Sequence, residues 1–162
     1  METVNNQYIP IKYDELPNGV NIIEAHQGSG KTYRIKDLIG QRTLVIGHRR
    51  ELGIQLIDRC EEMNFGDYEQ LSRKQLHTWR NLIICYPSLK KLKGRNFIDN
   101  GFDNLVIDEA NEVWASAFKF LPSNTNYKQL EDLFKYIPRK IVIGAYFPNY
   151  LLKDLERLSL YD

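Results

Sequence analysis

The sequence has few cysteines and no long apolar run. Cys60 and Cys85 are its two cysteines, and their spacing fits neither a disulfide framework nor a metal site. We expect both to be reduced thiols in a cytosolic protein. No apolar run approaches the roughly 20 residues of a transmembrane helix, and the N-terminal segment lacks the apolar core of a signal peptide. These absences exclude membrane-spanning and secreted classes and predict a soluble, intracellular protein.

The chain also lacks an excess of charge of either sign. It carries 22 Lys and Arg residues against 21 Asp and Glu residues. A strongly basic protein attracts nucleic acid through its overall field, so any such site in this chain has to be local. The length of 162 residues fits one domain, covering 1–162, with a substantial core.

Short β-branched runs alternate with longer segments of helical spacing. Strands are expected at 21–25, 43–47, 81–86, 103–108 and 140–146. Helices are expected from Tyr33 to a cap at Gly40, in 49–63, at 127–137 and at 149–158, and 65–79 is expected to be a loop with one helical turn at most. Continuous apolar strands that alternate with helices predict an α/β fold, with a parallel sheet of about five or more strands and helices on both faces.

A glycine-rich segment follows the first expected strand. IIEAHQGSGKTYRI (22–35) fits the pattern G-x-x-x-x-G-K-[ST], except that Ala25 stands at the first glycine. Glycines allow consecutive backbone N–H groups to curl around a phosphate at the start of a helix. The predicted nucleotide-binding residues are Gln27, Gly28, Ser29, Gly30, Lys31 and Thr32. Lys31 is expected to reach the terminal phosphates, and the Thr32 hydroxyl to ligate Mg²⁺.

A second element of the predicted site is an acidic pair. Asp108 and Glu109 follow the apolar run of 103–108. A carboxylate at the C-terminal end of a parallel strand points into the crevice where ligands bind in open α/β sheets. We therefore expect Asp108 to be a metal ligand and Glu109 to polarise the attacking water.

Four segments resemble the first RecA-like domain of superfamily 2 helicases. They are AHQGSGKT (25–32), LVIGHRREL (44–52), IICYPSLKKL (83–92) and VIDEAN (106–111), and they resemble motif I, motif Ia, the next strand with its serine-bearing turn, and motif II of that family. Superfamily 2 members often have alanine where Ala25 stands. The sequence most resembles the branch that contains the viral and plasmid replication origin-binding proteins.

The resemblance implies a P-loop NTPase fold that binds Mg²⁺ and ATP, with Lys31 and Glu109 as the catalytic residues. It implies a groove for single-stranded DNA, in which Arg49, Arg50 and Ser88 contact the backbone. The cell would be bacterial, or the infected host of a virus.

Two features depart from the family pattern. The run GAYFPNY, which starts at the end of the last expected strand, holds Gly144, Ala145 and Tyr146 where the family usually has hydroxyl or acidic side chains. The second RecA-like domain is absent from the sequence, and with it the arginine that completes the site. An arginine finger contributes about 10³–10⁵ in rate, so we expect this chain to hydrolyse ATP weakly until a second helicase domain or a replication protein supplies one.

Two other functions fit the same motifs. The first alternative is a non-motor regulatory module that binds nucleotide and a replication protein. The second alternative is a phage packaging-type ATPase domain. The paired arginines Arg49 and Arg50, and the turn at Ser88, favour the helicase relation over packaging.

Overall fold

A seven-stranded parallel sheet forms the centre of the molecule. The computed structural model describes residues 2–5, 11–26, 30, 33–92, 101–119 and 125–162. The sheet has the order β1-β2-β7-β6-β3-β5-β4, and every neighbouring pair is parallel. Its strands are β1 (Glu2–Asn5), β2 (Gly19–Glu24), β3 (Thr43–Gly47), β4 (Phe65–Asp67), β5 (Asn81–Cys85), β6 (Asn104–Ile107) and β7 (Arg139–Gly144).

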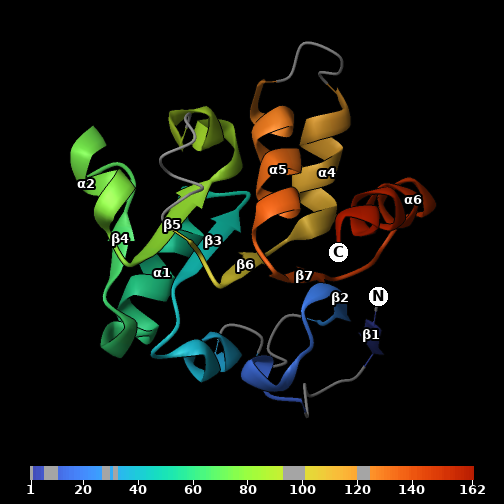
Figure 1. The fold of residues 1–162 in the computed structure, drawn as a ribbon, viewed down its shortest axis with the longest axis horizontal. Helices are drawn as coiled ribbons and strands as arrows, with labels where there is room; N and C mark the ends of the chain where they lie inside the picture. The colour runs from blue at the N-terminus through green and yellow to red at the C-terminus, as the bar shows by residue number, and fades with distance from the viewer. Residues whose placement is uncertain (1, 6–10, 27–29, 31–32, 93–100, 120–124) are drawn as a thin grey trace.

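Helices connect the strands (Figure 1). The α-helices are α1 (Arg50–Arg59), α2 (Arg73–Thr78), α4 (Ala110–Lys119), α5 (Thr125–Tyr136) and α6 (Asn149–Leu158). The 3₁₀ helices are η1 (Tyr13–Glu15), η2 (Tyr33–Leu38), η3 (Glu61–Met63), η4 (Tyr86–Leu92) and η5 (Ser159–Tyr161).

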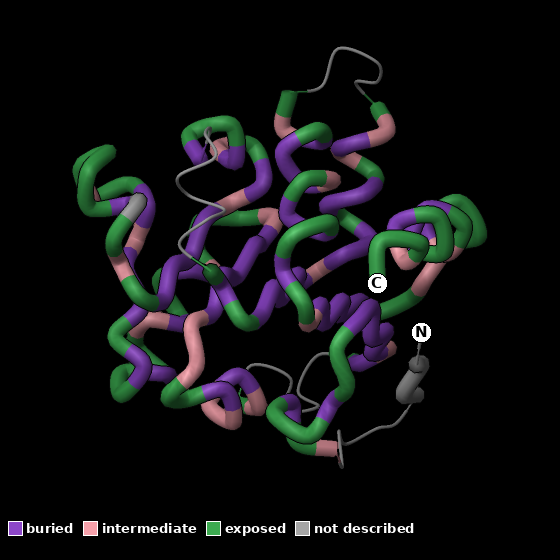
Figure 2. Tube along the Cα trace, viewed as in Figure 1, coloured by how far each residue is buried: buried purple, intermediate pink, exposed green. Residues whose placement is uncertain are grey.

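Both faces of the sheet are covered, because successive residues of each central strand enter opposite cores. In β3, Leu44 and Ile46 pack on one face while Val45 packs on the other. The first face lies under η4, α4, α5 and α6, and the second lies under η1, η2 and α1. Figure 2 shows the resulting band of buried residues through the middle of the molecule. Strands buried on both faces read as continuous apolar runs, which is why the sequence revealed them.

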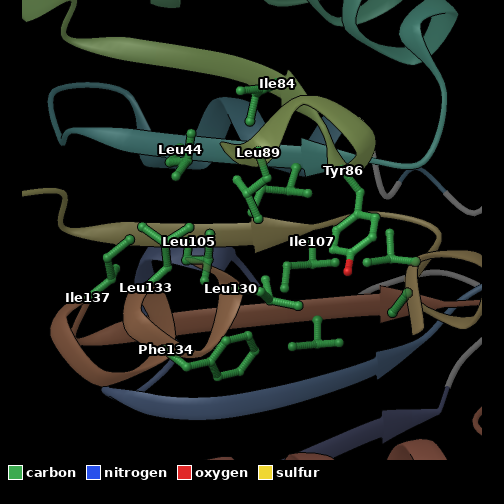
Figure 3. Packing of buried hydrophobic residues seen from close by; sticks show 14 of the residues in the cluster. Leu44, Ile84, Tyr86, Leu89, Leu105, Ile107, Leu130, Leu133, Phe134 and Ile137 are labelled. Carbon is green, nitrogen blue, oxygen red and sulfur yellow. The ribbon is translucent and has the colours of Figure 1, made fainter. Parts of the chain in front are cut away.

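Apolar side chains fill the space between the sheet and α5. Leu130, Leu133 and Phe134 point from α5 toward residues of β3 and β6, as Figure 3 shows. Trp114 of α4 meets Phe134 edge to face, with ring centroids 6.0 Å apart. This packing fixes α4, and α4 begins directly after the acidic pair.

The predicted fold class is confirmed, and the five expected strands all form. The helix expected from Tyr33 is a 3₁₀ helix, η2, and the helix expected in 49–63 divides into α1 and η3. Gly40 follows η2 with a φ of +87°, the left-handed backbone expected of a glycine cap.

Two strands and two α-helices were not predicted. The segment 65–79, expected to be a loop, contains β4 and α2. β4 is three residues long, which is too short to give a recognisable sequence pattern. The start of α2 could have been recognised, because Ser72 and Gln75 form a capping box. The polar edge strand β1 and helix α4 were also missed, although Val113, Trp114 and Ala117 give α4 a buried face. No helix in the described ranges is long and apolar enough to cross a membrane.

Candidate nucleotide site

A cleft of about 990 Å³ opens where the C-terminal ends of several strands meet. Ala25 after β2, Arg49 after β3, Asp108 after β6 and Ala145 after β7 all line it. Parallel strands bring these ends to one edge of the sheet, where ligands of open α/β sheets bind. The volume lies at the upper end of the roughly 300–1,000 Å³ of small-molecule pockets.

Asp108 lines this cleft and is 1% exposed. Its backbone N–H continues the β6 ladder by donating to Ile46 O over 2.9 Å. One of its carboxylate oxygens accepts from the Glu109 N–H over 2.8 Å. The side chain is therefore held by the backbone around it, as a preorganised ligand requires.

Glu109 has a left-handed backbone, with a φ of +52°. Its carbonyl accepts the Glu112 and Val113 N–H groups over 2.9 and 3.1 Å, so Glu109 is the capping residue just before α4. A non-glycine residue in this region costs about 1–2 kcal/mol. Such strain gathers at functional sites, and Glu109 lines the cleft together with Asp108.

The lining of the cleft also contains cations. Lys36 of η2, Arg49 just before α1 and Arg59 at the end of α1 line it. Lys36 also pairs with Glu62 over 3.5 Å. The cleft thus carries both carboxylates and cations, a combination suited to a metal-bound polyphosphate.

Asn111 adds an amide to the lining of the cleft. Its side chain lines the cleft although the residue is only 8% exposed, and it has no hydrogen-bond partner among the described residues. A Cβ on Gly144 would lie 3.3 Å from Asn111 Oδ1, so the glycine at the end of β7 leaves room for this amide. Because the side chain lines the cleft, a ligand bound there can form hydrogen bonds with the amide.

Tyr13 of η1 lies under the same edge and is fully buried. Burial raises the pKa of its hydroxyl, and the negative charge of Asp108, followed by that of Asp37, raises it further. The hydroxyl therefore stays protonated and uncharged at neutral pH.

The predicted phosphate-binding residues lie mostly outside the described residues. Gln27, Gly28, Ser29, Lys31 and Thr32 are not described, and only Gly30 is. Gly30 has a φ of +83° and lines the cleft, the backbone that a phosphate loop asks of a glycine.

The predicted DNA contacts lie in different surroundings. Arg49, exposed and just before α1, faces the nucleotide cleft. Arg50 pairs through Nε with Glu69 Oε2 over 2.7 Å and remains 52% exposed. Ser88 is half-buried in η4, with its Oγ 3.7 Å from Cys85 Sγ.

Sequence reasoning missed Asn111 and the cations Lys36 and Arg59. Leu52, Gln55 and Arg59 all line the cleft, and their spacing of three and four residues places them on one side of α1. That spacing was visible in the sequence, but the sequence did not show that this side of α1 lines the cleft. The pairing of Asn111 with Gly144 joins residues far apart in the chain, so no local pattern could reveal it.

The residues present fit Mg²⁺ with a nucleotide. A buried carboxylate at Asp108 and a second one at Glu109 are hard oxygen donors of the kind that Mg²⁺ takes, and Mg²⁺ keeps several waters beside one or two carboxylates and the substrate phosphates. The described residues hold no group of three or more His, Cys, Asp and Glu side chains arranged for a metal. This donor set therefore suits a metal that arrives with phosphate oxygens.

The sequence matches the family described as "Type III restriction enzyme, res subunit" over residues 11–147. That match covers most of the chain, and the chain belongs to this family. No curated protein matches the sequence.

Solved structures with the same fold are helicases and related ATPases. A hypothetical ATP-dependent RNA helicase from Sulfolobus tokodaii superposes with a TM-score of 0.66 at 19% identity, over 87% of this chain and 45% of its own. A DEAD box protein from Methanococcus jannaschii gives 0.63 at 18% identity, over 91% of this chain and 44% of its own. The Sulfolobus solfataricus SWI2/SNF2 ATPase core, solved with dsDNA, gives 0.60 at 16% identity, over 90% of this chain and 31% of its own. The chain thus has the RecA-like fold of superfamily 2 helicase domains and spans less than half the length of these proteins.

Proposed function

We propose that this member of the type III restriction enzyme res-subunit family is a helicase-like domain that binds Mg²⁺-ATP and single-stranded DNA, and that it hydrolyses ATP weakly by itself. One observation carries the proposal. Asp108 and Glu109 stand at the C-terminal end of β6, on the wall of a large cleft that the Gly30 backbone also lines. An acidic pair and a glycine loop at the same sheet edge are what phosphoryl transfer needs.

Each side chain of the cleft has a role in this proposal. Asp108 and Thr32 would hold Mg²⁺, which when bound neutralises charge on the phosphates. Lys31 binds the terminal phosphates, and Glu109 orients the attacking water.

The remaining polar lining binds and discriminates the nucleotide. Lys36 and Arg59 supply positive charge for the triphosphate. The Asn111 amide, which has no other partner among the described residues, donates to the terminal phosphate and so distinguishes ATP from ADP.

Single-stranded DNA binds beside the cleft. Arg49 and Arg50 follow β3 and Ser88 follows β5, and β3 and β5 are neighbours in the sheet. Basic side chains and a hydroxyl at adjacent strand ends form a local track for phosphates in a chain of nearly balanced charge. Within the family we place the chain with replication helicases, and a second helicase domain or a replication protein supplies the arginine that completes the site.

Isothermal titration with ATP and Mg²⁺ tests the nucleotide site. Wild-type protein should bind, Lys31→Ala should lose binding by at least about tenfold, and the exposed Lys128→Ala should match wild type. Glu109→Gln should bind ATP and lose the slow hydrolysis. Wild-type protein that binds no ATP with Mg²⁺ contradicts the proposal.

Fluorescence anisotropy at low salt tests the DNA track. Labelled single-stranded DNA should bind more tightly than RNA of the same sequence, and the double variant Arg49→Ala/Arg50→Ala should weaken binding while the ATP complex still forms. Lys128→Ala is again the control. Equal binding of DNA and RNA removes the replication assignment, and unchanged binding by the double variant removes these arginines from the track.

A further inference from the structure

A second cavity, of about 420 Å³, lies past the C-terminal ends of β4 and β5. These strands end the sheet on the side opposite β1 and β2, as the strand order gives and Figure 1 shows. The segment after β4, helix α2 and helix η4 surround it, and we call it the basic pocket for its cations Arg73, Lys90 and Lys91. None of these residues lines the nucleotide cleft.

The basic pocket has an excess of positive charge. Glu69 is the acidic residue in its lining, and its carboxylate already accepts from Tyr68 over 2.8 Å and pairs with Arg50 over 2.7 Å. Within the described part of the chain, Arg73 and Lys90 form no ion pair. A chain with a net charge of +1 thus concentrates cations here, which attracts an anion.

Hydrogen bonds hold the walls of the pocket in place. Ser72 and Gln75 cap α2 reciprocally over 2.8 and 3.2 Å, beside Arg73. Asn126 of α5 accepts from the Lys90 N–H over 2.8 Å and donates to Pro87 O over 3.1 Å, which ties η4 to α5. A preformed pocket loses little ordering entropy when a ligand enters.

The floor of the pocket is apolar. Leu71 is partly exposed and Leu76 is 4% exposed, and the Lys91 ammonium lies 5.2 Å from the centre of the Tyr68 ring. A bare phosphate would leave this floor unused. The lining instead fits a ligand with an anionic group and an apolar body, which describes a nucleotide unit or an acidic peptide with apolar side chains.

Continuity with the DNA track favours the nucleotide. Ser88 and Lys90 belong to the same helix, η4, and the Arg50–Glu69 ion pair joins the arginine of the track to the lining of the pocket. A strand on Arg50 and Ser88 therefore passes the mouth of the pocket. We propose that the basic pocket receives one unpaired nucleotide of this strand, with its phosphate on Arg73 and Lys90 and its base against Leu71 and Leu76; this rests on the proposed function.

Adjacent cations on α2 give a matched pair of variants. Arg73 lines the pocket, whereas its neighbour Lys74 is exposed and does not. Arg73→Ala should reduce the slope of log affinity for single-stranded DNA against log salt by about 0.7, the loss of one phosphate contact, and Lys74→Ala should leave it unchanged. Equal slopes for the two variants overturn the proposal.

An abasic unit moved stepwise along a labelled oligothymidylate tests the base contact. Wild-type protein should lose about tenfold in affinity at one position, and Leu71→Ser should lose this position dependence. A wild-type protein indifferent to every abasic position, yet binding the strand, overturns the pocket and leaves the proposed function. Wild-type protein that binds no strand overturns both. Binding of oligoglutamate that depends on Arg73, with DNA binding unaffected by Arg73→Ala, overturns the nucleotide and assigns the pocket to acidic peptides.

Discussion

Two buried aspartates at different places in the molecule show how the same side chain serves stability or function. Asp154 of α6 is 8% exposed and accepts from Trp114 Nε1 over 2.8 Å and from the Tyr127 hydroxyl over 2.5 Å. Arg157 completes its shell, with Nε 3.0 Å from the second oxygen. Its partners come from α4, α5 and α6, so this carboxylate joins three helices.

Asp108, at 1% exposed, differs in where its carboxylate faces. It lies at a strand end in the lining of a 990 Å³ cleft, next to Glu109 with its left-handed backbone, and cations line the same cleft. Asp154 is enclosed by aromatic donors, and burial together with the hydrogen bond to Asp154 raises the pKa of Tyr127. Burial alone therefore does not distinguish a structural carboxylate from a functional one, whereas the space in front of it does.

Replacing each aspartate with asparagine tests this difference, and the largest effect on stability is expected at Asp154. Asp154→Asn removes the charge that three donors share and turns an amide N–H₂ toward them, so the free energy of unfolding should fall by about 3 kcal/mol. Urea unfolding followed by circular dichroism measures it. The exposed Asp132→Asn on α5 should change it by less than about 0.5 kcal/mol. A loss at Asp154 no larger than this control would remove it from the structural role.

Asp108→Asn should have the opposite profile. Asparagine keeps an oxygen for the Glu109 N–H, so the free energy of unfolding should change by less than about 1 kcal/mol. The affinity for ATP in the presence of Mg²⁺ should fall by at least about tenfold, because a hard cation needs the carboxylate oxygen. Titration with and without EDTA measures the effect. Mg²⁺-dependent binding that survives in the variant contradicts a metal role for Asp108.

The comparison also marks what the sequence could predict. Each central strand contains a short continuous apolar run, so β2, β3, β5, β6 and β7 were predicted from local pattern alone. The acidic pair followed from its place after such a strand, and the structure puts Asp108 and Glu109 in one cleft with Gly30.

The parts that escaped prediction depend on contacts between distant segments. Asp154 reads in the sequence as one more acidic residue of an amphipathic helix, and only the meeting of α4, α5 and α6 reveals its partners. Asn111 likewise becomes a cleft residue because Gly144 leaves space beside it. The basic pocket needed β4 and α2, which were expected to be a loop.

A pair of buried amides extends the comparison to uncharged groups. Gln129 of α5 donates to Leu92 O over 2.6 Å, whereas Asn111 faces the cleft. Asn111→Leu keeps the volume, so stability should hold while the ratio of ATP to ADP affinity falls about fivefold, the value of one hydrogen bond near 1 kcal/mol. Gln129→Leu should keep the ratio and lose about 1 kcal/mol of unfolding free energy. Titrations with both nucleotides decide, and an unchanged ratio in Asn111→Leu refutes contact with the terminal phosphate.

The smallest expected effect concerns backbone strain, because Glu109 has a left-handed backbone and Asp154 does not. At a φ of +52°, Glu109→Gly relieves about 1–2 kcal/mol of left-handed strain and gives back about 0.5–1 kcal/mol through the greater freedom of glycine in the unfolded chain. We expect a net gain near 0.5 kcal/mol in urea unfolding, and Glu109→Gln, which keeps a side chain at the same φ, should show none. Both variants should lose hydrolysis, so the gain in stability comes at the expense of the reaction. A glycine variant less stable than the glutamine variant would show that the left-handed backbone at this position stores no strain for the site to use.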